Sequence, residues 1–341
     1  MTNLSELTTL HVGGPAQKVV RAKTEDQLVQ TINEADESGT PLLIIGRGSN
    51  LLVGDAGFNG TVIVVETEGN SHEIDACSGG MLQVAAGVDW DEFVAFTIAK
   101  NLANLESLSG IPGTVGAAPI QNIGAYGHEV SEVIARLRTY DRTTKSVKTF
   151  TADQCEFGYR DSLFKRDPER YVILDVTFQL RRGEHSLPIK YQELADQLGV
   201  ALETRVPTVD LRAAVLTLRA KKGMLYNSES HNWSAGSFFI NPIVPAAQAQ
   251  RLPDNAPRWP QPNGSIKLSA AWLMEHAGVA KGEALNGAKI SDAHVLALTN
   301  GGEATTADIL ALARSARARV EGKFGDGVLR RQPAPSRNTD V

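Results

Sequence analysis

The sequence predicts an α+β fold and not a doubly wound parallel sheet. Short apolar runs that are typical of buried strands alternate with amphipathic segments in the first third of the chain. Residues 133–150 have the pattern of a hairpin that turns near 142–145, and the last third of the chain is mainly helical. This mixed order indicates an α+β architecture, and 341 residues are enough for two or three domains.

Local signals along the chain predict the individual elements. A helix that follows Thr24 has Gln27 in capping-box spacing and Gly39 just past its end. The run 171–180 is the strongest strand signal in the chain. Further strands are expected over 18–22, 41–46 and 61–66, and further helices over 90–102, 210–222, 269–278 and 307–325. Four apolar residues share one face of the last helix: Leu310, Ala313, Val320 and Phe324.

Three other segments carry weaker signals. Residues 244–264 are rich in proline and predict a surface loop. Residues 326–341 have almost no apolar side chains, which predicts a loose tail. A further helix is expected to begin at Thr151, with Gln154 in capping-box spacing.

Composition excludes several classes of protein. The chain is 42% hydrophobic and 21% charged with a net charge of −5, which is ordinary for a globular protein and argues against nucleic-acid binding. Cys77 and Cys155 form no CxxC pair and are too few for a disulfide scaffold, which favours a reducing cytoplasm. The first residues lack the features of a signal peptide, and no apolar run is as long as a membrane span requires. His, Cys and carboxylate spacings predict no metal site.

The stretch "GRGSNLL" (46–52) follows an expected strand directly and combines small and polar residues: Gly46, Gly48, Ser49 and Asn50. Backbone N–H groups on such a turn can bind phosphate, with the Ser and Asn side chains assisting. The GxGxxG dinucleotide fingerprint fails, because its sixth position is Leu51. The alternative is a tight turn that needs only small residues.

A second group of small residues lies in "SGIPGTVGAAPIQNIGAYG" (109–127). Gly110, Gly113, Gly116, Ala117 and Ala118 fall within nine residues. The following "QNIGAYG" adds Asn122, Gly124, Ala125 and Gly127. Glycine lets the backbone approach a ligand closely, so the two loops could line a planar ligand and its diphosphate. Close packing of two backbones explains the same composition.

Two polar residues in apolar surroundings are candidates for catalysis. Ser237 in "SAGSFFINP" (234–242) precedes two phenylalanines, with Asn241 four residues on, and no GxSxG elbow is present. A hydroxyl in an apolar pocket can act as a general acid, although it can also satisfy a backbone group at a strand start. Arg160, which follows Tyr159 in "FGYRDS", can bind a carboxylate bidentately or form a surface ion pair.

Several other basic residues have structural explanations of different strength. Arg212 lies within an expected helix, and Arg219, Lys221 and Lys222 end it, where cations are favoured in any case. Lys267 stands at the start of "IKLSAAWLMEHAG", which is expected to form a strongly apolar helix, and an isolated lysine that faces an anion is plausible there.

Five motifs in this order give the sequence a clear resemblance over residues 8–325. "GRGSNLL", "SGIPGTVGAAPIQNIGAYG", "FGYRDSLFK", "GSFFINP" and "IKLSAAWL" resemble the UDP-N-acetylenolpyruvoylglucosamine reductase (UDP-N-acetylmuramate dehydrogenase) family. The resemblance implies an FAD-binding fold of the vanillyl-alcohol-oxidase (PCMH) type in two subdomains, plus a substrate-binding α+β subdomain. The expected bounds are 1–69 and 70–205 for the FAD subdomains and 206–325 for the substrate subdomain.

The resemblance also implies cofactors and site residues. NADPH would be the co-substrate, and FAD would be bound non-covalently by Gly46, Gly48, Ser49, Asn50, Leu51, Ile111, Thr114, Gly116, Asn122, Gly124 and Ala125. Arg160 matches the catalytic arginine and Ser237 the proton donor. Substrate contacts match Tyr159, Tyr191, Arg219, Lys222, Asn241 and Lys267. Tyr191, in "PIKYQEL", is similar to the lid tyrosine of the type I subgroup.

The sequence departs from the family at its C-terminal end. The family places a catalytic Glu on a strand that returns to the FAD half, and Arg331 occupies that position here. The five motifs nevertheless imply a reductase of the enolpyruvyl sugar nucleotide that acts in peptidoglycan precursor synthesis. The alternative is an FAD-binding homologue with weak or no turnover. An alcohol oxidase with covalently held FAD ranks last, because His128 is the one His or Cys close to either loop.

Overall fold

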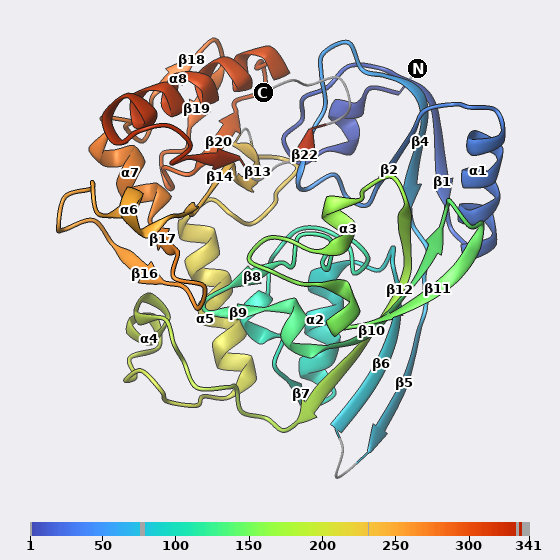
Figure 1. Cartoon of the computed structure of the whole chain (residues 1–341). Coiled ribbons are helices and arrows are strands. Elements are labelled where there is room, and N and C mark those ends of the chain that lie inside the picture. Colours follow the sequence, from blue (N-terminus) through green and yellow to red (C-terminus); the bar gives the residue numbers. More distant parts are fainter. Residues whose placement is uncertain (1, 76–78, 231, 332–333, 336–341) are drawn as a thin grey trace. The chain divides into compact units, whose positions relative to one another are not determined.

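The computed structural model describes residues 2–75, 79–230, 232–331 and 334–335 (Figure 1). Contacts divide the chain into two compact units. The central unit consists of residues 17–47 and 59–225, and the terminal unit consists of residues 1–16, 48–58 and 226–341. Each unit contains helices and sheets, which confirms the predicted α+β class.

The first sheet of the central unit has the order β1-β4-β2 and carries one helix beside it (Figure 1). Its elements are β1 (Ala16–Ala22), α1 (Glu25–Glu37), β2 (Leu42–Ile45) and β4 (Phe58–Val65). Thr24 Oγ1 caps α1 by accepting the Gln27 N–H at 3.1 Å. Gln27 Oε1 accepts from the Lys23 N–H and not from that of Thr24, so half of the predicted capping box forms. Leu28 and Ile32 then bury one face of α1.

The second sheet of the central unit has the order β11-β10-β12-β6-β5, with β7 paired to β12. Its strands are β5 (Asn70–Asp75), β6 (Gly79–Ala85), β7 (Leu102–Ala103), β10 (Ile134–Asp141), β11 (Ser146–Thr151) and β12 (Tyr171–Arg182). The pairing is antiparallel, and Val176 in β12 lies opposite both Leu137 in β10 and Val84 in β6. The predicted hairpin and the predicted strand 171–180 are both confirmed.

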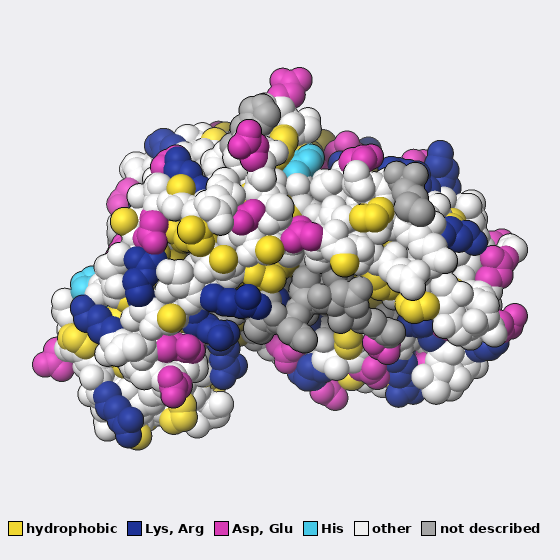
Figure 2. Space-filling model, turned by 90° about the horizontal axis from the view of Figure 1, so that it is seen from above, with side chains coloured by type: hydrophobic (Ala, Val, Ile, Leu, Met, Phe, Trp, Pro, Cys, Tyr) yellow, Lys and Arg dark blue, Asp and Glu magenta, His cyan; other side chains and the backbone are white. Residues whose placement is uncertain are grey.

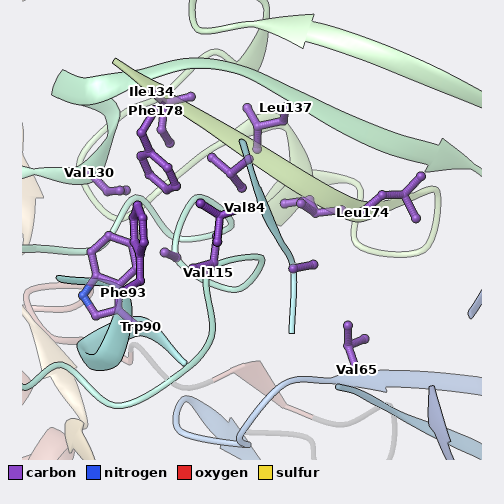
Figure 3. Packing of buried hydrophobic residues seen from close by; sticks show 14 of the residues in the cluster. Val65, Val84, Trp90, Phe93, Val115, Val130, Ile134, Leu137, Leu174 and Phe178 are labelled. Carbon is purple, nitrogen blue, oxygen red and sulfur yellow. The ribbon is translucent and has the colours of Figure 1, made fainter. Parts of the chain in front are cut away.

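The core of the central unit forms where α2 (Trp90–Ala99) packs against this sheet. Figure 3 shows the rings of Trp90 and Phe93 close to Phe178 from β12. The Phe93 and Phe178 ring centroids are 4.9 Å apart, and all three rings are almost fully buried. Aromatic groups of this size contribute much of the apolar area buried on folding, so they hold α2 at a defined place on the sheet. The first turn of α2 is thereby available to anchor a loop.

The remaining elements of the central unit are short except for one helix. They are η2 (Glu106–Leu108), β8 (Gly124–Ala125), β9 (His128–Glu129), η3 (Val130–Val133), η4 (Asp153–Cys155), α3 (Leu163–Arg166), α4 (Gln192–Leu198) and α5 (Thr208–Lys221). The helix predicted from Thr151 is wrong: Thr151 ends β11, and one 3-10 turn follows. Gln154 Oε1 accepts the Thr151 N–H at 2.9 Å, so the capping signal closes a turn and not a helix.

Buried ion pairs also stabilise the second sheet, and Asp141 gives a pH-dependent prediction. Burial raises the pKa of its carboxyl group, but Arg170, Lys148 and backbone N–H donors outweigh this and lower the pKa overall. Because the folded-state pKa lies below the unfolded value of about 3.9, this stability is present above that value and is lost as the pH falls below it.

We expect Asp141→Asn to lower the free energy of unfolding by about 1–3 kcal/mol at neutral pH. The difference from the wild type should shrink below about pH 4 in urea titrations. The exposed Asp153→Asn is the matched control and should change stability little. A difference for Asp141→Asn that stays constant down to pH 3 would contradict the assignment.

The described part of the terminal unit is built from small sheets, three α-helices and one 3-10 turn. Its helices are η1 (Leu4–Leu7), α6 (Ala246–Ala249), α7 (Ala270–His276) and α8 (Thr306–Phe324), the first of them a single 3-10 turn. Its sheets have the orders β13-β20-β19-β18, β15-β17-β16, β14-β21 and β3-β22. Their strands are β3 (Leu51–Leu52), β13 (Trp233–Ser237), β14 (Phe239–Ile240), β15 (Ile243–Val244), β16 (Arg258–Pro260), β17 (Ile266–Leu268), β18 (Ala284–Leu285), β19 (Ala288–Ile290), β20 (Ala297–Asn300), β21 (Arg330–Arg331) and β22 (Ala334–Pro335).

The predicted apolar face of α8 is confirmed. Leu310, Ala313 and Val320 are buried, and Phe324 packs against the same cluster. In Figure 1, α8 lies along β18 and β19 in the terminal unit. Thr305 and Asp308 form a complete capping box at its first turn.

Two sequence-based expectations about the terminal unit are wrong. Residues 244–264 are not only a surface loop, because they contain α6 and β16 and bury Leu252 and Ala256. Lys267 lies in β17 and not at the start of a helix, since α7 begins at Ala270. Main-chain pairing between strands as short as these leaves no periodic signal in the side chains.

The described part of the C-terminal segment is not a loose tail. Val328 and Leu329 are buried, β21 pairs with β14, and β22 runs parallel to β3. Two buried side chains and backbone hydrogen bonds are enough to anchor this segment, so apolar alternation is not required. Residues 332–333 and 336–341 lie outside the described part of the chain.

The two units are a coarser division than the three subdomains that the resemblance implies. Residues 48–58 belong to the terminal unit, and α5 belongs to the central unit, where it packs on η2 and α4. Over the described residues, no helix has the length and apolar character needed to cross a membrane.

Candidate functional site

The first turn of α2 anchors the small-residue loop 109–118 of the central unit. Trp90 donates from Nε1 to the Leu108 carbonyl at 3.0 Å and from its backbone N–H to the Gly113 carbonyl at 3.1 Å. Asp91 Oδ1 accepts the Gly110 N–H at 2.6 Å. These hydrogen bonds fix the backbone of the loop, although the loop is neither helix nor strand.

Asp91 also links this loop to α5. Arg212 donates to both Asp91 oxygens, at 2.7 and 2.8 Å, in a bidentate pair. Burial raises the pKa of the Asp91 carboxyl, but Arg212 and the Gly110 N–H lower it more, so the group stays ionised. The sequence places Arg212 within an expected helix without indicating a partner, and Asp91 is 121 positions away. No local pattern identifies that pairing.

The central unit brings two of the predicted FAD segments together. A Cβ added at Gly46 would lie 2.6 Å from Thr114 Oγ1, so the first glycine loop touches the second one. Ile111 lies in the same loop as Thr114 and packs partly against the core. Close packing against Thr114 therefore accounts for the glycine at position 46 and places the two predicted FAD segments side by side.

Other glycines in the predicted FAD segments have a packing role. A Cβ at Gly116 would lie 2.5 Å from the Ala86 Cβ, and the Gly116 N–H donates to the Ala86 carbonyl at 2.8 Å. In the terminal unit, Gly48 has φ +60°, and a Cβ there would lie 2.1 Å from the Leu7 carbonyl oxygen. Ser49 and Asn50 follow in a half-buried turn, and Leu51 begins β3. Close packing thus accounts for the small residue at Gly48 and at Gly116.

We expect Gly48→Ala to be strongly destabilising. A left-handed backbone costs alanine about 1–2 kcal/mol, and the clash with the Leu7 carbonyl adds about 1–3 kcal/mol. Gly264→Ala is the matched control in the same unit, because Gly264 has φ +80° with nothing within 4 Å of an added Cβ. Equal losses of stability in urea unfolding of the two variants would show that the clash with Leu7 is not significant.

Asn122 and Arg160 organise the loop that ends in β8. Asn122 Nδ2 donates to Glu129 at 2.8 Å and to the Gly158 carbonyl at 3.0 Å, and its Oδ1 accepts the Ser131 N–H. Arg160 donates from Nη1 to the Asn122 carbonyl at 3.1 Å and from Nη2 to the Gly124 carbonyl. The guanidinium therefore fixes the backbone of two predicted FAD contacts. Ala125 follows in β8 and packs against the core.

Arg160 sits in a strained and charged environment. Its φ of +55° is rare for a side chain of this size, and such strain concentrates at functional sites. Its guanidinium lies 5.2 Å from the centroid of the Tyr159 ring and 3.8 Å from the Glu129 carboxylate. The planar donor fork and the nearby ring suit a planar carboxylate ligand.

A cluster of aromatic and basic side chains surrounds Tyr126 in the central unit. Tyr191 is half exposed and meets the Tyr126 ring edge-on at 5.9 Å, and Lys222 lies 5.9 Å from the same ring while it pairs with Glu193. Burial raises the pKa of Tyr126 to about 12, so its hydroxyl stays neutral. Tyr191 and Lys222, two of the predicted substrate contacts, thus lie around one tyrosine that sequence reasoning did not single out.

Arg219 differs from the solvated helix-end residue that sequence reasoning favoured. Its side chain is 9% exposed, and Nη2 donates to the Met224 carbonyl at 2.9 Å. Its buried Nε has no hydrogen-bond partner among the described residues, and it lies near Gly110. Burial lowers the pKa of the guanidinium, but the group remains charged at neutral pH.

The terminal unit holds the other predicted residues. Ser237 ends β13 and is half-buried, and its Oγ lies 3.4 Å from His294 Nε2. Asn241 Oδ1 accepts the Ala270 N–H at 3.0 Å at the start of α7, and Lys267 in β17 lies opposite Ile243 in β15. His294 was missed from the sequence because it belongs to none of the motifs and lies 57 positions from Ser237.

The C-terminal segment pairs with the strand that follows this serine. In β21, Arg331 lies opposite Phe239, two residues after Ser237. Burial and the charge of Arg317 lower the pKa of its guanidinium, and Nη1 is buried without a hydrogen-bond partner in the described structure. The position that the family resemblance gives to a carboxylate therefore carries a half-buried cation.

Comparisons with known proteins identify the family of the chain. Residues 16–149 match the FAD binding domain, and residues 228–328 match the C-terminal domain of UDP-N-acetylenolpyruvoylglucosamine reductase. The reductase of this name from Cutibacterium acnes is 51% identical over 326 residues, which cover 94% of this chain and 86% of the relative. The chain belongs to the UDP-N-acetylenolpyruvoylglucosamine reductase family. The resemblance in the sequence motifs is thereby confirmed, together with FAD as the cofactor.

Further members of the family support the same assignment. The Streptomyces avermitilis reductase is 47% identical over 94% of this chain and 90% of its own length. The crystal structure of the Thermus caldophilus reductase covers 98% of this chain and 97% of its own, with a TM-score of 0.67 at 23% identity. That structure shows the shared fold. FAD fits the residues present, because the Gly46 and Thr114 loops adjoin and Arg160 holds the Asn122–Gly124 backbone in place.

Proposed function

We propose that this chain reduces the enolpyruvyl group of UDP-N-acetylglucosamine enolpyruvate to UDP-N-acetylmuramate with NADPH. The reaction belongs to peptidoglycan precursor synthesis in the cytoplasm. The observation that carries the proposal is the 51% identity to a reductase of this name over 94% of the chain. The side chains of Ser237 and Arg160 support it, because a hydroxyl can donate a proton and a guanidinium can stabilise a carboxylate.

The residues of the chain have distinct roles in this proposal. The FAD contacts are those expected from the resemblance, Gly46, Thr114 and Gly124 among them. Bound FAD would take hydride from NADPH and supply it to the methylene carbon of the substrate. Arg160 stabilises the negative charge that develops on the substrate carboxylate, and Ser237 donates a proton to the carbon beside that carboxylate.

The substrate contacts form a second group. Tyr191, Lys222 and Arg219 surround Tyr126 and bind the nucleotide part, while Tyr159 flanks Arg160. Asn241 and Lys267 contribute from the terminal unit. We propose a monomer or weak oligomer with small-molecule partners only. Acidic and basic side chains both occur over the face in Figure 2, and the net charge of the chain is −5, so nucleic acid is not among the proposed partners.

Non-covalent binding of FAD is part of the proposal. His128, the imidazole close to the second loop, is 8% exposed, and its Nδ1 lies 2.9 Å from the Glu132 carboxylate. An imidazole that is buried and hydrogen-bonded in this way is poorly placed to attack a flavin. Acid precipitation should leave all yellow colour in the supernatant, and coloured precipitate would contradict non-covalent binding.

The two half-reactions test the function separately. Under anaerobic conditions, NADPH should bleach the flavin absorbance, and the enolpyruvyl compound should then restore it. Mass spectrometry should identify UDP-N-acetylmuramate as the product. A flavin that is reduced by NADPH and is never reoxidised by this compound would overturn the proposed activity.

The alternative, an FAD-binding homologue with weak turnover, follows from Arg331. If the cation at this position limits the reaction, Arg331→Glu should raise the rate of the second half-reaction by about tenfold or more. Arg330→Glu makes the same charge change at the exposed neighbouring residue and should have little effect. No gain in rate with Arg331→Glu would count against weak turnover caused by Arg331.

A further inference from the structure

We propose that His294 is a positioning residue that acts through Ser237. It donates its Nε2 proton to Ser237 Oγ, directs the hydroxyl toward the substrate and replaces the proton that Ser237 gives up. The inference rests on the proposed function, in which Ser237 is the proton donor. It assigns a role to a residue that belongs to none of the sequence motifs.

A β-bulge brings Ser237 to its place in β13. Ser234 lies opposite Thr299 in β20, but Ser237 lies opposite Ala297, so three steps along β13 match two along β20. The extra residue is accommodated at Gly236, which has φ +70° and donates its N–H to Ser234 Oγ at 3.3 Å. A bulge redirects the side chain that follows it, and such bulges are common next to active sites.

A tight turn brings His294 to the same point. The Ala297 N–H donates to the His294 carbonyl at 3.0 Å, and the Ser291 N–H donates to the Ala297 carbonyl at 2.9 Å. Val295 and Leu296 within the turn are buried in the core of the terminal unit. Ala297 therefore belongs both to the turn and to the bulged pairing, and this shared residue holds the imidazole beside Ser237.

The backbone that follows Ser237 is also held in place. The Leu296 carbonyl accepts the Phe238 N–H at 2.7 Å, directly after Ser237. Phe238 and Phe239 are almost fully buried, so this backbone has little freedom to move. Both partners of the 3.4 Å contact between Ser237 Oγ and His294 Nε2 are thus held by main-chain bonds and core side chains.

The proton balance defines the chemistry. A serine hydroxyl has one proton, so when that proton points at the substrate the oxygen can only accept from His294. In the transfer, the Ser237 O–H bond breaks as the substrate C–H bond forms. His294 acts here as the imidazolium: its Nε2–H bond breaks as the Ser237 O–H bond re-forms, which leaves neutral imidazole. That imidazole then takes a proton back from water. The net result is one proton moved from water to carbon.

The C-terminal strands hold no side chain that could supply a proton to Ser237. β21 and β22 carry no acidic residue, and β21 brings Arg330 and Arg331 opposite β14. A guanidinium does not release its proton near neutral pH, so Arg331 cannot supply Ser237. Imidazole is the side chain that can exchange a proton with water in this range. His294 is the group that the structure places in contact with the Ser237 hydroxyl.

NMR of the histidine side chains tests the contact without reference to turnover. The protein is loaded with FAD and its seven histidines are labelled with 15N. The signal that disappears in His294→Gln is assigned to His294. We expect a proton on Nε2 in the resting protein and a changed Nε2 shift in Ser237→Ala. A bare Nε2, or a shift that is unchanged in Ser237→Ala, would overturn the proposal.

Two variants then separate proton supply from simple positioning. His294→Gln keeps an amide donor but cannot pass on a proton, and His294→Phe keeps volume without any donor. We expect both to slow reoxidation of the flavin by the substrate at least about tenfold, with reduction by NADPH and FAD content unchanged. Wild-type reoxidation in His294→Gln would overturn proton supply. If wild-type protein never reduces the enolpyruvyl compound, the proposed function fails. The NMR measurement of the proton on His294 Nε2 still shows whether His294 donates to Ser237.

Discussion

Replacing Ser237 by alanine is expected to slow flavin reoxidation by the enolpyruvyl substrate by about 10²–10⁴-fold. The hydroxyl is the proposed proton donor, and the loss of a positioned general acid typically has this effect. Reduction of the flavin by NADPH involves no proton from Ser237, so its rate should not change. Stopped-flow absorbance of the two half-reactions measures both rates in one preparation.

Ser228→Ala is the matched control for this prediction. Ser228 is exposed in the same unit, and its substitution also removes a hydroxyl group. Stability and both half-reactions should stay close to wild type. If Ser237→Ala reoxidises at the wild-type rate, or if both half-reactions slow equally, Ser237 is not the proton donor.

Replacing Arg160 by lysine is expected to weaken both FAD binding and turnover. Lysine keeps the positive charge but cannot donate to the Asn122 and Gly124 carbonyls at the same time. The second half-reaction should slow by about 10²–10³-fold, as is typical when one preorganised donor to a developing charge is lost. Because the loop backbone loses its tether, the Kd for FAD from flavin fluorescence should rise as well.

Arg166→Lys is the matched control, because the partners of Arg166 are the exposed carboxylates of Glu156 and Asp161. Exposed ion pairs contribute little, so FAD affinity and both rates should stay near wild type. An Arg160→Lys variant that binds FAD normally would show that the tether to Asn122 and Gly124 is unimportant. A normal rate of reoxidation would remove Arg160 from the proposed mechanism.

Much of the fold could be predicted from the sequence because its signals are local. The Thr24 cap of α1, the apolar face of α8 and the run that forms β12 each depend on residues a few positions apart. Side-chain period and capping act within one element, so a single sequence displays them. The same holds for the turn of the β10–β11 hairpin.

Elements that depend on distant partners could not be predicted. β21 and β22 form because β14 and β3 present backbone groups for pairing, and nothing in residues 328–335 reveals this. Thr151 illustrates the converse case. A correct local capping signal closes one turn after β11, because the chain turns back there and no apolar helical face follows.

Candidate residues and their likeness to a known family could be found by reading the chain, because short motifs preserve the chemical groups that a site requires. The sequence by itself determined the family, the cofactor and the candidate roles of Ser237 and Arg160. Only the tertiary structure decided that Gly116 and Gly48 are small because they pack on other backbone, that Arg219 is buried, and that His294 meets Ser237. The physical reason is that packing and hydrogen bonds depend on which residues are close in space. Ser237 and His294 are 57 positions apart in the sequence, and they meet because Ser237 pairs with Ala297, three residues after His294.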